Sequence, residues 1–355
     1  MIKRRKTRLV RIGNIGIGYK FPVSIQAMAK AKTQDIKSIV REMHDLEKNG
    51  AEAIRLAVKD KRDVDSLKHI KELVKVPLIA DIHFDWRLAV AAINNGVDKI
   101  RINPGNIYKK DEIKQIVLEA KKAHIPIRVG VNSGSISKKV SNIQSPVIKM
   151  VRSALDYLRL IEKMGFYDIV VSLKASDVIQ TIAAYRKFAS ICDYPLHLGI
   201  TAAGASGQAQ IKSAIGIGAL LSEGIGDTIR VSLTGPSVNE VITAKQILNA
   251  LNLRRFDRLE VISCPTCGRC EVDLAKVVGD LEQKLLAIDY QPSAMPLKVA
   301  IMGCIVNGPG EAREADLGLA FGRKSAILFK KGKIIKKVDA ITAAENLFQE
   351  IKRII

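Results

Sequence analysis

The sequence predicts an α/β fold, in which a (β/α)8 barrel up to residue 252 is followed by a small α+β domain. Eight short, apolar, β-branched runs alternate with amphipathic segments before residue 252, as strand–helix units do. The pattern then changes, and the next stretch of chain contains most of the cysteines. An open, doubly wound sheet is the alternative, but no G-x-G-x-x-G motif follows the first run.

Each barrel strand is predicted from a run rich in valine, isoleucine and leucine. The runs are 23–28, 53–58, 77–82, 99–103, 126–131, 168–173, 195–200 and 228–233. The intervening segments have helical periodicity. In 34–49, for example, Ile39, Met43 and Leu46 share one face, and Gly50 is placed to end the helix.

The remaining segments flank the barrel. Residues 1–22 fit a small hairpin with G-N-I-G-I-G as its turn region. Residues 253–355 form the predicted second domain. Its expected strands are 259–264, 296–304, 317–322 and a hairpin over 326–338, with one helix after the first strand and another at the end of the chain.

Composition excludes several classes of protein. Of the 355 residues, 47% are hydrophobic and 26% charged, which is typical of a globular protein and not of a disordered one. The basic N-terminus has no apolar stretch behind it, and no run approaches the roughly 18 apolar residues of a membrane span. We therefore expect a cytoplasmic protein without membrane contact. Five cysteines, an odd number, do not suggest a disulfide framework.

The net charge of +21 raises the question of nucleic-acid binding. However, the lysines and arginines are scattered along the chain, and aromatic residues make up only 5%, which leaves few platforms for stacking bases. A small polyanionic substrate explains the charge equally well, so no nucleic-acid partner is expected.

Arginines recur inside the predicted barrel strands. Arg55, Arg101, Arg128 and Arg230 each follow an isoleucine within a strand-like run. Barrel strands are covered on both faces, so a charge there is costly unless an anion meets it. Other polar residues lie near the carboxyl ends of the strands, where barrel enzymes have their catalytic groups. They are Gln26, Asp81, His83, Asn103, Asn132, Lys174, Ser176, His197, Thr201 and Ser232. This pattern predicts an anionic, phosphorylated ligand, to which the glycine-rich segment 201–208 could also contribute.

Two cysteine segments indicate a metal or cluster site. The first is S-C-P-T-C-G-R-C-E, with Cys264, Cys267 and Cys270, and the second is G-C-I-V-N-G-P-G-E, with Cys304. No histidine follows His197, so zinc would need all four cysteines. A [4Fe–4S] cluster fits these spacings at least as well.

These segments closely resemble the signature of the 4-hydroxy-3-methylbut-2-enyl diphosphate synthase family, which acts in the methylerythritol phosphate route to isoprenoids. The resemblance covers nearly the whole chain. It continues through A-D-I-H-F-D (80–85), R-I-N-P-G-N-I (101–107), R-V-G-V-N-S-G-S (128–135), S-L-K-A-S-D-V (172–178), P-L-H-L-G-I-T (195–201) and L-L-S-E-G-I-G-D-T-I-R-V-S-L (220–233).

The resemblance implies a [4Fe–4S] cluster held by Cys264, Cys267, Cys304 and Glu311, in a ferredoxin- or sulfite-reductase-like domain after a TIM barrel. It also implies a homodimer in which the cluster domain of one subunit closes the barrel of the other. The implied substrate is 2-C-methyl-D-erythritol 2,4-cyclodiphosphate. Two electrons from reduced flavodoxin or ferredoxin would open its ring and expel a hydroxyl as water.

Residue roles follow for this reaction. The four strand arginines and Lys174 would bind the diphosphate, with Asn103, Asn132, Ser176, Thr201 and Ser232 as further substrate contacts. Asp81, His83 and His197 are candidates for positioning groups or delivering protons, and Asn307 is expected to touch the carbon skeleton. Cys270 is expected to be a bystander.

The chain also departs from the family pattern. It reads I-T-A-A-G where the family usually has I-T-E-A-G, so Ala202 replaces a glutamate. It has alanine at Ala27 and Ala29 in place of two hydroxyl residues, and Val170 where many members have lysine. Three function classes stay open here: the reductive enzyme, an electron carrier or iron–sulfur sensor that uses the second domain, and a zinc protein that binds nucleic acid. Because of the departures, a slowed or repurposed paralogue is the alternative to a fully active enzyme.

Overall fold

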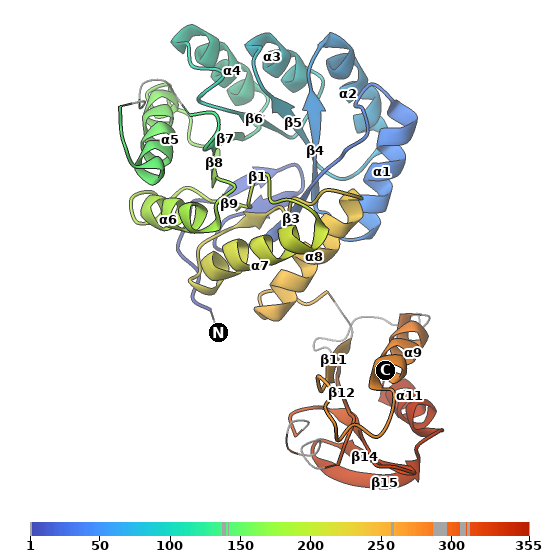
Figure 1. Ribbon diagram of the computed structural model, residues 1–355. Helices are drawn as coiled ribbons and strands as arrows, with labels where there is room; N and C mark the ends of the chain where they lie inside the picture. Colours follow the sequence, from blue (N-terminus) through green and yellow to red (C-terminus); the bar gives the residue numbers. More distant parts are fainter. Residues whose placement is uncertain are drawn as a thin grey trace. The chain divides into compact units, whose positions relative to one another are not determined.

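A computed structural model of the chain describes residues 2–136, 140, 142–256, 259–286, 297–305, 310 and 313–354 (Figure 1). The chain divides into two compact units, one reaching residue 254 and the other starting at residue 255. None of the helices among these residues is long and apolar enough to span a membrane.

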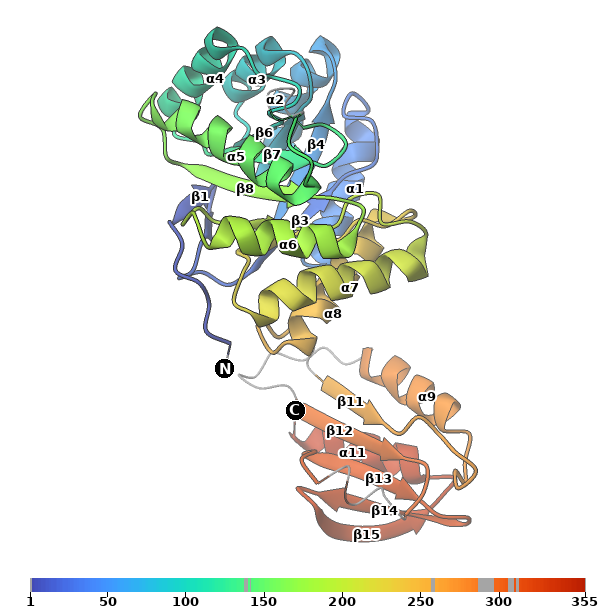
Figure 2. The same cartoon turned by 60° about the vertical axis from the view of Figure 1, so that its left-hand side comes forward.

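The first unit is a barrel of parallel strands inside a ring of helices (Figures 1 and 2), which confirms the predicted fold class. Its strands are β3 (Ser24–Met28), β4 (Ala53–Val58), β5 (Leu78–Ile82), β6 (Lys99–Ile102), β7 (Ile127–Asn132), β8 (Ile169–Lys174), β9 (His197–Leu198) and β10 (Thr228–Ile229). They pair in the order β8-β7-β6-β5-β4-β3-β10-β9. A parallel bridge between Val171 of β8 and Leu196, directly before β9, closes the ring of strands.

The helices begin where the sequence supplies a cap. Asp35, Asp60, Asp85 and Asp177 each accept a backbone N–H bond at the start of their helix, which satisfies a donor that has no partner inside the helix. The helices are α1 (Ile36–Lys48), α2 (Lys61–Leu73), α3 (Trp86–Asn94), α4 (Lys110–Lys122), α5 (Pro146–Glu162), α6 (Val178–Ala189), α7 (Ser206–Ser222) and α8 (Ser237–Ala250). Gly50 follows the last residues of α1 in a left-handed conformation, with φ of 105°.

The N-terminal hairpin closes one end of the barrel. It consists of β1 (Val10–Ile12) and β2 (Ile15–Ile17), so the turn lies at residues 13–14 and not across the whole G-N-I-G-I-G segment. The hairpin residues Val10, Ile12 and Ile17 form one buried cluster with Val170, near the start of β8. The opposite end, where the strands terminate, is left for the site.

The second unit is a mixed sheet with helices packed on its core. Its strands are β11 (Leu259–Ser263), β12 (Leu297–Met302), β13 (Leu317–Phe321), β14 (Ser325–Lys330) and β15 (Lys333–Asp339), in that spatial order. β11, β12 and β13 run parallel to one another, whereas β14 pairs antiparallel with both β13 and β15. The helices α9 (Leu274–Leu286) and α11 (Ala343–Ile354) bury Leu281 and Leu347 in the same cluster as Ile301 and Leu319 of the sheet.

Candidate active site at the open end of the barrel

A cavity of about 130 Å³ lies at the carboxyl ends of the barrel strands, where barrel enzymes have their active sites. It is lined by Arg55, Asp81, His83, Arg101, Arg128, Asn132, Ser172, Lys174, Ile200, Thr201, Arg230 and Ser232. Every strand from β4 to β10, or the loop directly after it, contributes to this wall. Five of the lining side chains are cationic and one is a carboxylate, so the cavity is built to receive an anion.

Asp81 is the carboxylate around which the cations are arranged. Its Oδ1 accepts a hydrogen bond from Arg101 Nη1 at 3.2 Å, and its Oδ2 lies 3.8 Å from Arg55 Nε. His83 Nε2 lies 3.3 Å from Oδ2. Burial alone would raise the pKa of Asp81, but Arg55, the His83 hydrogen bond and the other arginines outweigh it, so the pKa is lowered. Asp81 is therefore charged at neutral pH.

Arg128 is the most deeply buried of the arginines in the cavity. Its side chain has one hydrogen bond, from Nη1 to Gln26 Oε1 at 3.3 Å, and its Nε has no hydrogen-bond partner among the described residues. Burial, then Arg55 and Arg101, lowers the pKa of Arg128 well below its usual value. A buried guanidinium that lacks hydrogen-bond acceptors and a counter-charge binds an anion favourably, because the anion supplies both.

Two glycines, Gly130 within β7 and Gly199 directly after β9, make room for the cations. A Cβ at Gly130 would lie 2.6 Å from Arg101 Nε, so β7 has no side chain where Arg101 crosses it. A Cβ at Gly199 would lie 2.6 Å from Lys174 Nζ and 2.5 Å from the Arg230 carbonyl oxygen. Glycine within a strand often marks such a close approach.

Three of the residues expected at the site do not line this cavity. The Asn103 side chain is used in its own loop, where Nδ2 donates to Ser135 Oγ at 2.6 Å and Oδ1 accepts from Gly105 N at 2.9 Å. Ser176 is exposed after β8. His197 is fully buried inside the barrel, with Nδ1 3.5 Å from Thr228 Oγ1. None of the three lines the cavity.

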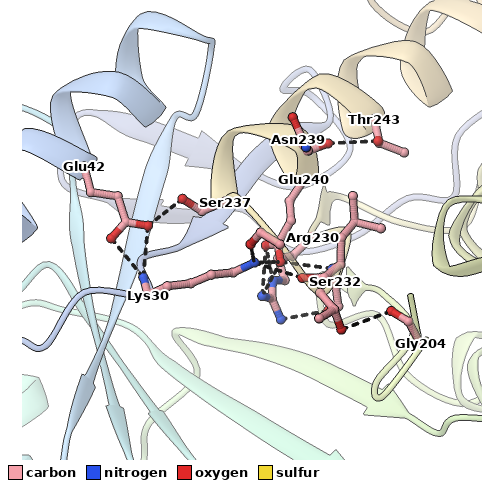
Figure 3. Close-up of polar contacts among 12 residues, drawn as sticks. Lys30, Glu42, Gly204, Arg230, Ser232, Ser237, Asn239, Glu240 and Thr243 are labelled. Atoms are coloured by element: carbon pink, nitrogen blue, oxygen red, sulfur yellow. Dashed lines mark hydrogen bonds and ion pairs between the residues drawn. The ribbon is translucent and has the colours of Figure 1, made fainter. Parts of the chain in front are cut away.

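Arg230 has a carboxylate partner outside the barrel, on α8. Its Nε and Nη2 donate to Glu240 Oε2 at 3.2 and 2.9 Å, and its Nη1 donates to Ser232 Oγ at 2.7 Å (Figure 3). Glu240 is only 2% exposed. Glu240 could not be predicted from the sequence, because an acid near the start of a helix carries no signal of its own.

Anion binding should raise the pKa of Lys174. Burial, then Arg128 and Arg55, lowers the pKa of this buried amine well below its usual value. A bound anion raises this pKa again, so pyrophosphate binding should be accompanied by proton uptake in the pH range where the Lys174 amine of the free protein titrates. Calorimetry in buffers of different ionisation enthalpy measures this uptake. Equal uptake by the wild-type protein and Lys174→Met would contradict the assignment to Lys174.

Two cysteines of the second unit lie at the same end of its sheet. Because β11 and β12 are parallel neighbours, Cys264 and Cys304 follow them at the same end. Gly303 N donates to Cys264 Sγ at 3.3 Å, and Glu271 N donates to Gly303 O at 2.9 Å. Within the described ranges, no three Cys, His, Asp or Glu residues are placed to hold a metal ion. Asn307 and Glu311 lie outside the described residues.

The donors on this loop fit a thiolate-bound iron site. Cys264 Sγ already accepts a backbone N–H bond, the kind of contact that stabilises a sulfur ligand and tunes a cluster. Cys267 is exposed, and hydrogen bonds from Arg269 lower the pKa of its thiol. Cys270 differs from both, since its thiol donates a hydrogen bond to Val272 O at 3.2 Å.

Comparison with known proteins identifies the family. The GcpE TIM-barrel domain model matches residues 7–245, and the GcpE protein C-terminal domain model matches residues 260–353. The chain belongs to the GcpE family. A 4-hydroxy-3-methylbut-2-en-1-yl diphosphate synthase (flavodoxin) from Caldanaerobacter subterraneus subsp. tengcongensis is 51% identical, over 100% of this chain and 99% of the relative. One of the same name from Fusobacterium nucleatum is 49% identical, over 99% and 97%.

Solved structures support the fold of this GcpE barrel. The dihydropteroate synthase from Stenotrophomonas maltophilia matches with a TM-score of 0.54 and 12% identity, over 69% of this chain and 98% of that structure. At this identity the similarity concerns the fold alone. The matched part, 69% of this chain, corresponds in length to the barrel unit, which ends at residue 254.

The positions at which the chain departs from the GcpE pattern differ in how close they lie to the cavity. Val170 packs under the N-terminal hairpin and does not line the cavity. Gln26 and Met28 both reach cavity arginines, so the alternation of a strand turns Ala27 toward the helices. Ala202 is different. It is exposed, it follows the cavity residue Thr201 directly, and its φ is 49°.

Proposed function

We propose that this GcpE chain converts 2-C-methyl-D-erythritol 2,4-cyclodiphosphate to 4-hydroxy-3-methylbut-2-enyl diphosphate. The observation that carries the proposal is the cavity with five cations at the open end of the barrel, in a chain about half identical to curated synthases over its whole length. In this reaction two electrons and one proton open the ring at a carbon–oxygen bond and release a hydroxyl group as water. The product is an open diphosphate with one more negative charge.

The residues of the cavity have distinct roles in this proposal. Arg55, Arg101, Arg128, Lys174 and Arg230 bind the diphosphate oxygens and stabilise the charge that develops when the ring opens. Asp81 holds Arg55 and Arg101 in place and balances part of their charge. His83, half exposed beside Asp81, can hold a proton at Nε2 for the leaving hydroxyl.

The proposed cofactor is a [4Fe–4S] cluster held by Cys264, Cys267, Cys304 and Glu311. When bound, the cluster supplies electrons one at a time and a Lewis-acidic iron. The arginines of the cavity keep the substrate oriented, and the walls of the barrel exclude water from it. Reduced flavodoxin is the proposed electron donor, as the names of the relatives indicate, with ferredoxin as the alternative.

The proposed assembly is a homodimer in which each active site takes its barrel from one chain and its cluster from the other. Mixing two inactive variants tests it. Arg128→Met disables the barrel and Cys264→Ser the cluster, so only a mixed dimer contains an intact site. Co-refolding the two variants should restore turnover. No recovery, with mixed dimers present by native mass spectrometry, would contradict the shared site.

The decisive experiment is anaerobic reconstitution with iron and sulfide, followed by turnover of the cyclodiphosphate with a strong reductant. We expect a brown protein that forms the open diphosphate. A cluster that assembles without product formation would support a repurposed paralogue. A colourless protein with stoichiometric zinc would contradict the cluster.

Ala202→Glu tests the effect of the departure nearest the cavity. Because the family motif has glutamate here, we expect the variant to raise turnover, by up to about 100-fold, the lower end of what one acid–base group contributes. Steady-state kinetics of the reconstituted enzyme would measure the change. Ala202→Gln is the matched control and should give no increase. A turnover number unchanged by Ala202→Glu would show that this position needs no carboxylate.

A further inference from the structure

The carboxylate of Glu240 connects the substrate cavity to two loops around it (Figure 3). Arg230 uses its Nε and Nη2 for Glu240, so this edge of the guanidinium faces away from the ligand. Its remaining nitrogen, Nη1, donates to Ser232, and both residues line the cavity. Nη2 also donates to Glu240 Oε1 at 3.1 Å, so both carboxylate oxygens are engaged, and this bidentate pair fixes the plane of the guanidinium.

Glu240 also fixes the backbone of the segment after β10. Its Oε1 accepts a hydrogen bond from Leu233 N at 3.0 Å, one residue after Ser232. The carboxylate therefore controls both the side chain of Arg230 and the chain segment that presents Ser232. A group that makes both contacts sets the position of this part of the cavity wall.

Lys30 completes the arrangement from the loop after β3. Its Nζ lies 3.1 Å from Glu240 Oε1 and donates to Leu233 O at 2.9 Å and Gly235 O at 2.5 Å. The buried Glu240 carboxylate is thus balanced by two cations. Because the three acceptors occupy the Lys30 ammonium, Lys30 serves as a brace between the loops and not as a ligand for substrate.

Glu42 provides a comparison, because it ties the same loops without touching Arg230. Its carboxylate accepts from Lys30 N and Ala31 N, each within 3.0 Å, and from Ser237 Oγ at 2.5 Å. Loss of Glu42 therefore loosens the loops but leaves the guanidinium pair intact. Comparing variants of Glu42 and Glu240 therefore distinguishes the effect of anchoring the loops from the effect of positioning Arg230.

We propose that Glu240 is the positioning residue for diphosphate binding, acting through Arg230. It preorganises one edge of the guanidinium toward the cavity, and Lys30 keeps Glu240 in place. This inference rests on the proposed function for the identity of the substrate. Its mechanism, however, applies to any diphosphate in the cavity. Preorganisation lowers the cost of binding because Arg230 need not be ordered when the anion arrives.

The test is Glu240→Gln in the reconstituted holoenzyme, with inorganic pyrophosphate as the probe in calorimetry. We expect its Kd to rise about tenfold or more, since a charge-assisted contact loses its geometry. In turnover of the cyclodiphosphate, KM should rise more than kcat falls. Glu42→Gln, the matched control, should change the pyrophosphate Kd less than about twofold. An equal effect of both variants would overturn the proposal.

A double-variant cycle separates positioning from a general structural role. In an Arg230→Met background, Glu240→Gln should not weaken pyrophosphate binding further, because the residue through which Glu240 acts is gone. Additive losses in pyrophosphate affinity would overturn the proposal. If Glu240→Gln does not fold, Lys30→Met replaces it. We expect that variant to weaken binding several-fold, and wild-type affinity would count against the proposal.

The two proposals fail in different ways. A wild-type enzyme that binds pyrophosphate in the Glu240-dependent manner but does not convert the cyclodiphosphate overturns the proposed function and leaves the role of Glu240 standing. A wild-type enzyme that turns over the substrate with the same KM as Glu240→Gln overturns only the positioning role.

Discussion

Replacing Cys264, Cys267 or Cys304 singly with serine is expected to remove the iron–sulfur cluster and all turnover with it. Serine keeps nearly the same shape but is not a thiolate at neutral pH, and iron–sulfur clusters are held by thiolates. Visible absorption and bound iron, measured after anaerobic reconstitution, should both fall to background. The barrel should keep its thermal unfolding transition, because these residues belong to the separate unit that begins at residue 255.

Cys270→Ser is the matched control on the same loop. The Cys270 thiol donates to Val272 O and packs against the core of its unit, so its bonding is already used within the protein. We expect this variant to keep the cluster absorption, with a loss of stability of about 1 kcal/mol from the buried contact. Loss of the cluster in a folded Cys270→Ser protein would show that the ligand assignment is wrong.

The barrel could be predicted from the sequence because its strands combine two signals. Runs such as 126–131 and 168–173 are continuous and β-branched, as strands covered on both faces are, and helical segments separate them. The arginines inside these runs then indicated the cavity. A charged side chain in a covered strand must face the barrel interior, and such side chains from different strands converge there.

Individual site residues were harder to predict where a strand has already ended. Asn103 and Asn132 both follow arginine-containing runs, yet Asn132 lines the cavity and Asn103 bonds Ser135 and Gly105. Asn132 is the last residue of β7, while Asn103 lies just after β6. The direction of a side chain outside a strand depends on the turn that follows, and short turns are not specified by hydrophobic pattern.

The contacts that helix and loop residues outside the barrel strands make with the cavity could not be predicted from the sequence. Glu240 lies on α8, and its position beside Arg230 depends on how the helix packs against β3 and the loop after β10. The contact of Lys30 could not be predicted either, because a lysine in an exposed loop is common and carries no specific signal. Gly130 and Gly199 did carry a signal, since glycine weakens a strand and therefore suggests a close contact, but the contacting residue could not be named from sequence.

Asp81→Asn is expected to destabilise the barrel by about 3 kcal/mol, because it removes the charge that compensates Arg55 and Arg101 in a buried site. Asparagine keeps the shape and can still accept the hydrogen bond from Arg101, so the loss reports the charge. Thermal unfolding would detect it as a fall in Tm of roughly 6–12 °C. Asp85→Asn, four residues on, is the control. Asp85 caps α3 and pairs with Arg87 at the surface, and asparagine is an equally good cap, so its loss should stay below about 1 kcal/mol.

The acid dependence of stability gives a second test of the same charge. The pKa of Asp81 is lowered in the folded protein, so its contribution to stability is present above its unfolded value near 3.8 and is lost as the pH falls below that value toward the folded one. The free energy of unfolding of the wild-type protein should therefore fall more steeply below about pH 4 than that of Asp81→Asn. Parallel curves for the two proteins would mean that Asp81 is not ionised against the arginines. In that case the cavity would need an anion from solution, such as its diphosphate ligand, to hold its cations together.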